Sequence, residues 1–320
     1  LRTHAHVTRL DAEHNHVIGV SYQIEGEIYC ASARRETLLC AGAISSPHLL
    51  QLSGIGPGEL LQDLEIPLVH ASPGIGEGLQ DHYAVRVSQQ INKAISLNHR
   101  SRGVRLLWET NRWYLNGGGL LAFSPAHVGA FLCTNPELPF PDLQFVFTPA
   151  SYAESADPIG KLHPYPGITC GVWQMVPTSR GFVRAASSDP FRSPAIQPNY
   201  LSSESDQLAV VRGLKWCRKL LNTDALKPYL LDEILPGPKC QQDDDLLTYA
   251  AKSGTTVYHP VGSCRMGTDR TAVVDPQLRL KGMTGLRVVD ASVMPTMVSA
   301  NTNAATLMIA EKAAQLILDQ

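Results

Sequence analysis

Apolar and polar positions alternate along the first 40 residues of the chain, which is typical of half-buried β-strands. Residues 3–10 and residues 17–24 follow this alternation, and the polar segment Asp11–His16 between them predicts a turn. Residues 27–33 continue the pattern after a second turn. Residues 36–40 end in Thr-Leu-Leu-Cys, a short run that is apolar on both faces and therefore predicts a central strand of a parallel sheet.

Small residues follow this predicted strand and lead into a helix. The sequence from position 41 reads Ala-Gly-Ala-Ile-Ser-Ser-Pro, so Ser45 or Ser46 is predicted to cap a helix that has Pro47 in its first turn. Small residues at a strand-to-helix junction allow close approach of either a ligand's phosphates or another stretch of backbone. The local sequence leaves open whether this junction binds a ligand or serves only helix–strand packing.

The middle of the chain has a different character. From residue 84 to residue 253 prolines are frequent and short apolar runs alternate with polar residues, which predicts half-buried strands. Strands are expected at Leu143–Phe147, Ile168–Val176 and Gly181–Ala185, and helices at Ser203–Leu221 and Asp243–Ala251. We therefore predict a second domain of the α+β class, built on an antiparallel sheet.

The C-terminal part returns to a strand followed by a helix. Leu286–Asp290 predicts a strand that ends in an acidic residue, and Ala304–Leu318 predicts a helix. Asn301, Thr302 or Asn303 can cap this helix, and the N–H groups at its start favour negative charge. A carboxamide there could donate a hydrogen bond to an alkoxide, or it could serve only as a cap. The residues expected to face inward are Leu307, Ala310, Ala314 and Ile317.

One histidine stands in a stretch with unusual backbone constraints. This stretch, Tyr258–Gly267, reads Tyr-His-Pro-Val-Gly-Ser-Cys-Arg-Met-Gly. Pro260 biases His259 toward extended backbone, and Gly262 and Gly267 allow tight turns after it. A neutral imidazole held in this way can take a proton from a substrate hydroxyl near physiological pH. On this stretch alone the alternative stays open, namely a buried histidine that caps a loop through hydrogen bonds.

Composition and charge exclude several classes of protein. The 320 residues suffice for two cores, and a net charge of −2 gives no electrostatic basis for binding nucleic acid. No apolar run reaches the roughly 18 residues that a transmembrane helix needs. The seven cysteines are scattered and contain no Cys-x-x-Cys, which is typical of reduced cytosolic thiols. No metal site is predicted, because His259 and Cys264 have no second pair at ligand spacing.

Two glycine pairs come near a dinucleotide-binding fingerprint, and neither completes it. Glu59 stands where the pair Gly54-x-Gly56 would need its third glycine, and Leu79 stands there for Gly74-x-Gly76. Neither pair follows a clear buried strand, so both are predicted to lie in loops. The sequence thus has features of a nucleotide site without the phosphate-binding turn that normally anchors the nucleotide.

Three segments in this order resemble the glucose–methanol–choline (GMC) oxidoreductases, flavoproteins that oxidise alcohols. They are Gly42–Gly56, Tyr258–Gly267, and Gly285–Pro295 followed by Asn-Thr-Asn-Ala from position 301. Pro73–His82 adds a fourth, softer match. The resemblance covers essentially the whole chain and is closest to the choline dehydrogenase-like branch. It implies the C-terminal portion of such an enzyme, lacking the N-terminal Gly-rich turn that clamps the FAD diphosphate.

The resemblance also implies a fold and a division into domains. The fold is α/β plus α+β, part of a Rossmann-like FAD-binding domain with an inserted substrate domain on an antiparallel sheet. Residues 1–83 are expected to form the first part of the FAD-binding domain, and residues 84–255 the substrate-binding domain. Residues 256–320 are expected to form the C-terminal part of the FAD-binding domain and to carry the catalytic histidine.

Roles for particular residues follow from the same resemblance. His259 matches the catalytic base, which takes the hydroxyl proton while hydride leaves the carbon for flavin N5. Asn301 matches its partner position, which is His in some members of the family. FAD is the implied cofactor. The residues expected to contact it are Val7 beside the adenine, Tyr258, Asp290 and Ala291 at the strand end, and Asn301 and Thr302 at the helix start.

The implied reaction is oxidation of the CH–OH group of a primary alcohol, a small-molecule substrate. The electron acceptor stays open among a quinone, a dye-type acceptor and oxygen. A cytoplasmic location is expected, with any membrane association arising through that acceptor. A lyase of the same fold would keep the base without a net redox change, and a nicotinamide enzyme is disfavoured by the incomplete fingerprints. The alternative from a different class is a non-catalytic, truncated fragment that cannot hold FAD by itself.

Overall fold

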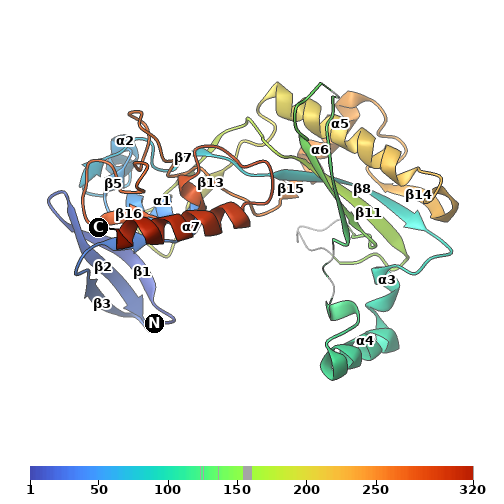
Figure 1. Cartoon of the computed structure of the whole chain (residues 1–320), viewed down its shortest axis with the longest axis horizontal. Coiled ribbons are helices and arrows are strands. Elements are labelled where there is room, and N and C mark those ends of the chain that lie inside the picture. Colours follow the sequence, from blue (N-terminus) through green and yellow to red (C-terminus); the bar gives the residue numbers. More distant parts are fainter. Residues whose placement is uncertain (123, 125, 136, 154–160, 320) are drawn as a thin grey trace. The chain divides into compact units, whose positions relative to one another are not determined.

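The structure is a computed structural model, and it describes residues 1–122, 124, 126–135, 137–153 and 161–319. The chain forms two compact units, both drawn in Figure 1. Unit 1 comprises Leu1–Asp81, Pro177–Ser202 and Tyr258–Gln320, and unit 2 comprises His82–Val176 and Ser203–Val257. The sequence pattern puts residues 177–202 in the middle domain, whereas the structure places them in unit 1.

Unit 1 opens with a three-stranded antiparallel sheet, seen in blue in Figure 1. Its strands are β1 (His6–Glu13), β2 (His16–Ile24) and β3 (Glu27–Ser32), in the order β1-β2-β3. Leu10 of β1 and Val17 of β2 belong to the core of the unit, whereas the residues of β3 are exposed. The alternation of apolar and polar residues therefore predicted these strands to within a few residues of their ends.

A pair of parallel strands follows, β4 (Thr37–Leu39) and β16 (Leu286–Val288), with Thr37 opposite Leu286. The parallel direction agrees with the prediction for residues 36–40. The expected burial on both faces is met only in part, because Leu39 is buried while Leu38 is exposed. In the described part of the chain each of these strands has the other as its only ladder partner.

Helix α1 (Gly42–Leu52) begins earlier than the sequence predicted, which corrects the expected role of Pro47. Ser45 and Ser46 lie inside the helix and not at its cap, and Pro47 lies past its first turn. The start of the helix is instead stabilised by a carboxylate from another segment, described below. A capping serine is therefore not needed at the position where the sequence pattern placed one.

The rest of unit 1 consists of short elements and one long helix. They are α2 (Gly58–Asp63), the parallel pair β5 (Ile55–Gly56) and β6 (His70–Ala71), the sheet of β7 (Glu77–Leu79), β12 (Gly181–Arg184) and β13 (Ala195–Gln197), the 3₁₀ turn η3 (Ala291–Val293), and α7 (Asn303–Leu318).

Helix α7 buries a different face from the predicted one. Ile309 and Ala313 are buried, whereas Leu307, Ala310 and Ala314 are exposed. Apolar residues occur all round this helix, so their spacing does not define which side faces the core. The predicted inward face was wrong for that reason.

Unit 2 is built on an antiparallel sheet of six strands, as the sequence predicted for the middle domain. The path β14-β8-β11-β10-β9 contains Leu230–Leu235, Tyr83–Ile91, Gly167–Gln174, Leu143–Thr148 and Val128–Leu132, and β15 (Thr255–Thr256) pairs with β8. Helix α5 (Glu204–Leu221) lies along this sheet in Figure 1 and contacts β11 and β8, and α6 (Asp243–Ser253) packs on α5. Both helices were predicted from their spacing.

Helix α4 (Gly103–Asn116) of unit 2 was not predicted. It extends between α3 (Leu97–Arg100) and the 3₁₀ turn η1 (Leu120–Ala122), and a second 3₁₀ turn, η2 (Lys227–Tyr229), precedes β14. Glu109 is the one residue of α4 whose side chain is buried. One face of this helix is apolar and open to solvent, and it consists of Val104, Leu107, Trp108, Tyr114 and Leu115.

Candidate functional site

His259 and Asn301 lie next to each other in unit 1, although 42 positions separate them in the sequence. Asn301 Nδ2 is 3.2 Å from His259 Nε2. Because the amide nitrogen can only donate, this bond requires a lone pair on Nε2, and a neutral imidazole then carries its hydrogen on Nδ1. The structure thus brings together the two residues to which the sequence assigned the catalytic roles, at the start of α7.

A carboxylate holds the main chain of His259. Asp81 Oδ1 accepts a hydrogen bond of 2.9 Å from the backbone N–H of His259, and Asp81 Oδ2 accepts one of 2.5 Å from the hydroxyl of Tyr200. Burial of the imidazole lowers the pKa of His259, and the negative charge of Asp81 offsets part of this effect by raising it. The net pKa lies below the usual value, so the ring is mainly neutral at pH 7 and able to accept a proton.

The segment that ends at Asp81 pairs with the chain that follows His259. Gly76 N–H donates to the carbonyl of Ser263 at 2.7 Å, and Gln80 and Val261 exchange two backbone hydrogen bonds of 3.0 and 2.9 Å. Gly262 has a φ of +87°, and a Cβ added there would lie 2.8 Å from the carbonyl oxygen of Gly78. Only glycine fits this close approach, which agrees with the predicted turn at Gly262.

Asp290 joins the end of β16 to the start of α1. Its Oδ2 accepts from the backbone N–H of Gly42 at 3.0 Å and from the hydroxyl of Ser46 at 2.6 Å, and its Oδ1 accepts from the N–H of Ser292 at 2.8 Å. A negative charge at a helix start is favourable, because the backbone N–H groups there point outward. The Asp290 side chain therefore already occupies the start of α1, where a ligand's phosphate would otherwise bind.

A second hydrogen bond links α1 to the loop that carries His259, and it compensates for the N–H that Pro47 lacks. Proline has no N–H, so the carbonyl four residues earlier in the helix, that of Ala43, loses its helical partner. The hydroxyl of Ser263 donates to this carbonyl at 2.5 Å. The loop that carries His259 is in this way attached to α1 through a hydrogen bond that the proline makes available.

The remaining predicted FAD contacts are distributed over unit 1. Ala291 opens η3, and its carbonyl accepts from the N–H of Gly262 at 3.4 Å, next to the His259 loop. Thr302 is buried and precedes α7, whose start has no side-chain cap. Tyr258 is exposed and has a φ of +62°. Val7 is exposed on β1. Further along this strand, Leu10 N–H donates to Oγ of Ser53, at the C-terminal end of α1, at 2.8 Å.

Gln80, Asp81 and Tyr200 belong to this arrangement and were missed as site residues. Gln80 and Asp81 lie in Pro73–His82, the segment that gave the softer match to the family, so a signal for them existed. Tyr200 gave none, because it meets Asp81 from 119 positions away and its surroundings in the sequence are ordinary.

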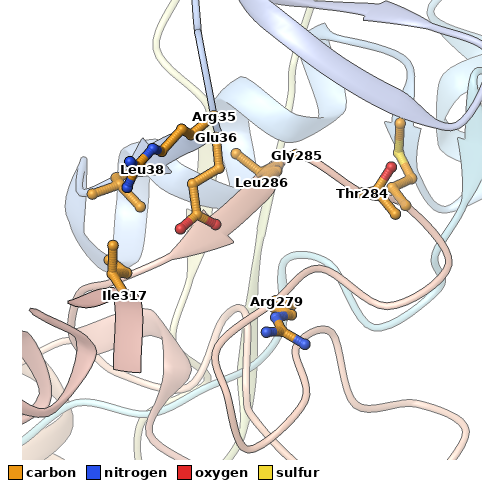
Figure 2. A pocket seen from close by; sticks show the side chains of 9 residues that line it. Arg35, Glu36, Leu38, Arg279, Thr284, Gly285, Leu286 and Ile317 are labelled. Atoms are coloured by element: carbon orange, nitrogen blue, oxygen red, sulfur yellow. The ribbon is translucent and has the colours of Figure 1, made fainter. Parts of the chain in front are cut away.

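Unit 1 also has a cavity of about 570 Å³, which lies elsewhere. Figure 2 shows its lining around β4 and β16, with Glu36 and Leu38 on one strand segment and Gly285 and Leu286 on the other. Glu36 precedes β4 and Gly285 precedes β16, so the cavity is at the amino ends of these strands. Ligands of parallel sheets bind at the carboxyl ends, where Asp290 and α1 lie, and His259 does not line this cavity.

Within the described ranges no three His, Cys, Asp or Glu residues lie together in a way that could hold a metal ion. Cys264, which follows His259 by five residues, is fully buried, and desolvation raises the pKa of its thiol. Across the residues that the structure describes, no helix has both the length and the apolar character to cross a membrane.

Comparisons with known proteins agree with the resemblance seen in the motifs. Two family models, both described as GMC oxidoreductase, match residues 1–84 and residues 177–310. The chain is 41% identical over 323 residues to oxygen-dependent choline dehydrogenase of Yersinia pseudotuberculosis serotype IB, a match that covers 98% of this chain and 55% of that protein. The Escherichia coli O127:H6 protein of the same name is 38% identical, with 99% and 57% covered.

Solved structures of similar proteins have the same fold. Pyridoxine 4-oxidase from Mesorbium loti is 28% identical with a TM-score of 0.83, covering 99% of this chain and 57% of that one. A formate oxidase from Aspergillus oryzae RIB40, studied for its FAD modification, has a TM-score of 0.89 at 22% identity, with 98% and 59% covered. The chain therefore spans somewhat more than half the length of the relatives it matches. By its matched segments, its relatives and its fold, it belongs to the GMC oxidoreductase family.

Proposed function

We propose that this chain carries the catalytic pair of an FAD-dependent oxidoreductase that acts on the CH–OH group of a small primary alcohol. The observation that carries the proposal is the pairing of Asn301 Nδ2 with His259 Nε2 at 3.2 Å, together with the lowered pKa of His259. A neutral imidazole with its lone pair on Nε2 is the form that a general base needs. The relatives named choline dehydrogenase support an alcohol as the substrate.

His259 and Asn301 would act on the same oxygen of the substrate. A hydroxyl placed between the two side chains donates its hydrogen to His259 Nε2 and accepts a hydrogen bond from Asn301 Nδ2. As the proton moves to the imidazole, negative charge grows on the oxygen, and the bond from Asn301 becomes stronger. The substrate hydroxyl therefore replaces the direct bond between the side chains, which lie at hydrogen-bonding distance without it.

FAD is the group that would supply the redox chemistry, by taking up the hydride from the carbon. The start of α7 in unit 1 fits such a group. Helix α7 begins next to Asn301 without a side-chain cap or an acidic residue in its first turn. Its first N–H groups can thus serve an electronegative ring edge. We propose Val7, Tyr258, Ala291 and Thr302 as further contacts, and the main chain of Asp290, since its carboxylate is engaged with α1.

The test uses the polypeptide that contains these 320 residues as its organism makes it. Flavin absorption bands in the purified protein that bleach when a primary alcohol such as choline is added without oxygen would support the proposal. Replacing the base, His259→Ala, should slow the bleaching by about 10²- to 10⁴-fold, the usual contribution of a positioned base. A protein that binds FAD and bleaches equally fast without His259 would exclude this residue as the base. A protein that takes up no FAD would favour the non-catalytic alternative.

A further inference from the structure

We infer that Gln80 and Asp81 together set the distance between His259 and Asn301, and that Tyr200 supports them. These three would be positioning residues, which contact neither the substrate nor the reacting atoms. The inference deepens the proposed function and rests on it. Six hydrogen bonds within unit 1 meet at Gln80 and Asp81, two consecutive residues.

Three of these bonds hold the His259 side of the pair. Asp81 Oδ1 accepts the backbone N–H of His259 at 2.9 Å. One residue earlier, Gln80 forms a two-way backbone bridge with Val261, two residues after His259. The main chain is therefore fixed at and just beyond the histidine, and this limits where the imidazole can point.

The side chain of Gln80 holds the other side of the pair. Its Oε1 accepts the backbone N–H of Met297 at 2.9 Å, and its Nε2 donates to the carbonyl of Pro177 at 2.6 Å. Gln80 is 1% exposed, so both ends of its amide are satisfied by backbone in a buried position. Met297 comes four residues before Asn301 and is itself buried. The amide of Gln80 thus fixes the segment that leads to Asn301.

The two loops are attached to neighbouring residues of one strand-like segment. Consecutive Cα atoms are about 3.8 Å apart and cannot change their separation. A shift of the His259 loop relative to the Asn301 loop would therefore break at least one of the bonds made by Gln80 or Asp81. Such a geometry suits two side chains that have to bind one oxygen atom, because a misplacement of about 1 Å can cost about 10²-fold in rate.

Tyr200 keeps the Asp81 carboxylate in place. Its hydroxyl donates to Asp81 Oδ2 at 2.5 Å, which leaves Oδ1 for the backbone of His259. Pro177 and Tyr200 lie at or near the two ends of the segment Pro177–Ser202. Gln80 bonds to Pro177, and Asp81 bonds to Tyr200. The segment that the sequence pattern placed in the middle domain is in this way part of the support for the catalytic pair.

The experiment separates positioning from simple stabilisation by measuring the imidazole of His259 directly. In protein labelled with ¹³C and ¹⁵N at histidine, the pKa of His259 is followed by NMR, with His259→Gln to assign its signal. Asp81→Asn keeps an oxygen that can accept the N–H of His259 but removes the negative charge. Because that charge raises the pKa of His259, we expect the pKa to fall further in this variant.

Gln80→Met removes both side-chain bonds of Gln80 at nearly unchanged size. We expect kcat for flavin reduction to fall by about ten- to hundredfold with a smaller change in KM, because the substrate still binds but the pair is misaligned. Gln51→Met is the matched control. Gln51 is also fully buried in unit 1, and its amide bonds to the backbone of Ile75, Val183 and Ala185 at 3.2, 3.0 and 2.6 Å. Gln51→Met should destabilise the fold at least as much as Gln80→Met does, without lowering kcat.

The outcomes distinguish this inference from the proposed function. It is overturned if Asp81→Asn leaves the pKa of His259 unchanged, or if Gln80→Met lowers kcat no more than Gln51→Met does. Tyr200→Phe removes the hydroxyl that holds the Asp81 carboxylate and should lower kcat less than Gln80→Met does, and full activity in this variant would exclude Tyr200. If His259→Ala itself leaves flavin reduction intact, the proposed function fails, while the NMR response of His259 to Asp81→Asn still tests whether Asp81 sets its environment.

Discussion

The charge on His259 determines the pH dependence expected of this site. Desolvation lowers the pKa of His259 below its ordinary value of about 6.5, and the attraction of Asp81 does not cancel the effect. Only the neutral ring can act as a base. We therefore expect the rate of flavin reduction to rise as pH increases through the pKa of His259, and to reach its plateau at a lower pH than it would with a histidine of ordinary pKa.

Anaerobic stopped-flow measurements between about pH 5 and pH 9 would follow this rise. The profile of kcat/KM reports on the free protein and is the one to compare with the pKa of His259 from NMR. A rate that increases well above pH 7 would contradict a histidine whose pKa is lowered. The Asp81→Asn variant should shift the rise to lower pH.

At the scale of elements, the bond from Ser263 to the carbonyl of Ala43 gives a prediction about how α1 tolerates its proline. In Ser263→Ala this carbonyl is left buried without a side-chain donor, since Pro47 has no N–H to offer. We expect a loss of about 1–3 kcal/mol in the free energy of unfolding. The measurement is denaturant unfolding followed by circular dichroism.

A double-mutant cycle tests the cause of that loss. In a Pro47→Ala background the new N–H can bond to the Ala43 carbonyl, so Ser263→Ala should cost less there than in the natural chain. Ser21→Ala serves as the control, because Ser21 is a buried serine of unit 1 whose hydroxyl bonds to Asp11. Equal costs of Ser263→Ala in both backgrounds would mean that the proline does not create the need for this hydroxyl.

The same helix shows why the sequence predicts some elements and not others. Alternation located β1 and β2, and spacing located α5, because each of these elements buries one side. An acidic start indicated α6. The start of α1 was misplaced because its cap comes from Asp290, a residue 248 positions away from Gly42. No local pattern can reveal a cap supplied by so distant a carboxylate, so Pro47 was taken for a first-turn residue.

From the sequence, site residues could be proposed only where a short motif indicates them. His259 with its proline and glycines, and Asn301 before a helix, were proposed because they stand in segments that resemble the family. The contact between them at 3.2 Å, and the support from Gln80, Asp81 and Tyr200, depend on how distant segments fold together. Such contacts depend on the tertiary structure. The sequence pattern predicted the fold class but not which distant side chains meet.

At the scale of the whole molecule, the exposed apolar face of α4 favours contact with another protein surface, and a second copy of the chain is the partner tested first. Val104 and Leu115 are 81% and 86% exposed, and Leu107, Trp108 and Tyr114 are exposed on the same side of the helix. The buried Glu109 is held on the other side by Arg100 and lies 3.8 Å from Arg112. Apolar side chains gathered on one exposed face favour contact with another copy or another protein.

We therefore expect the apparent mass in sedimentation experiments to rise with protein concentration. Leu107→Lys should weaken the association by about tenfold or more, since burying one leucine contributes about 1.5–3 kcal/mol. Its cost to stability should be small, because Leu107 is 66% exposed in the isolated chain. Thr248→Lys adds the same charge at an exposed position of α6 and should leave the association unchanged. A mass independent of concentration, or equal effects of the two lysines, would show that the open face of α4 does not drive association.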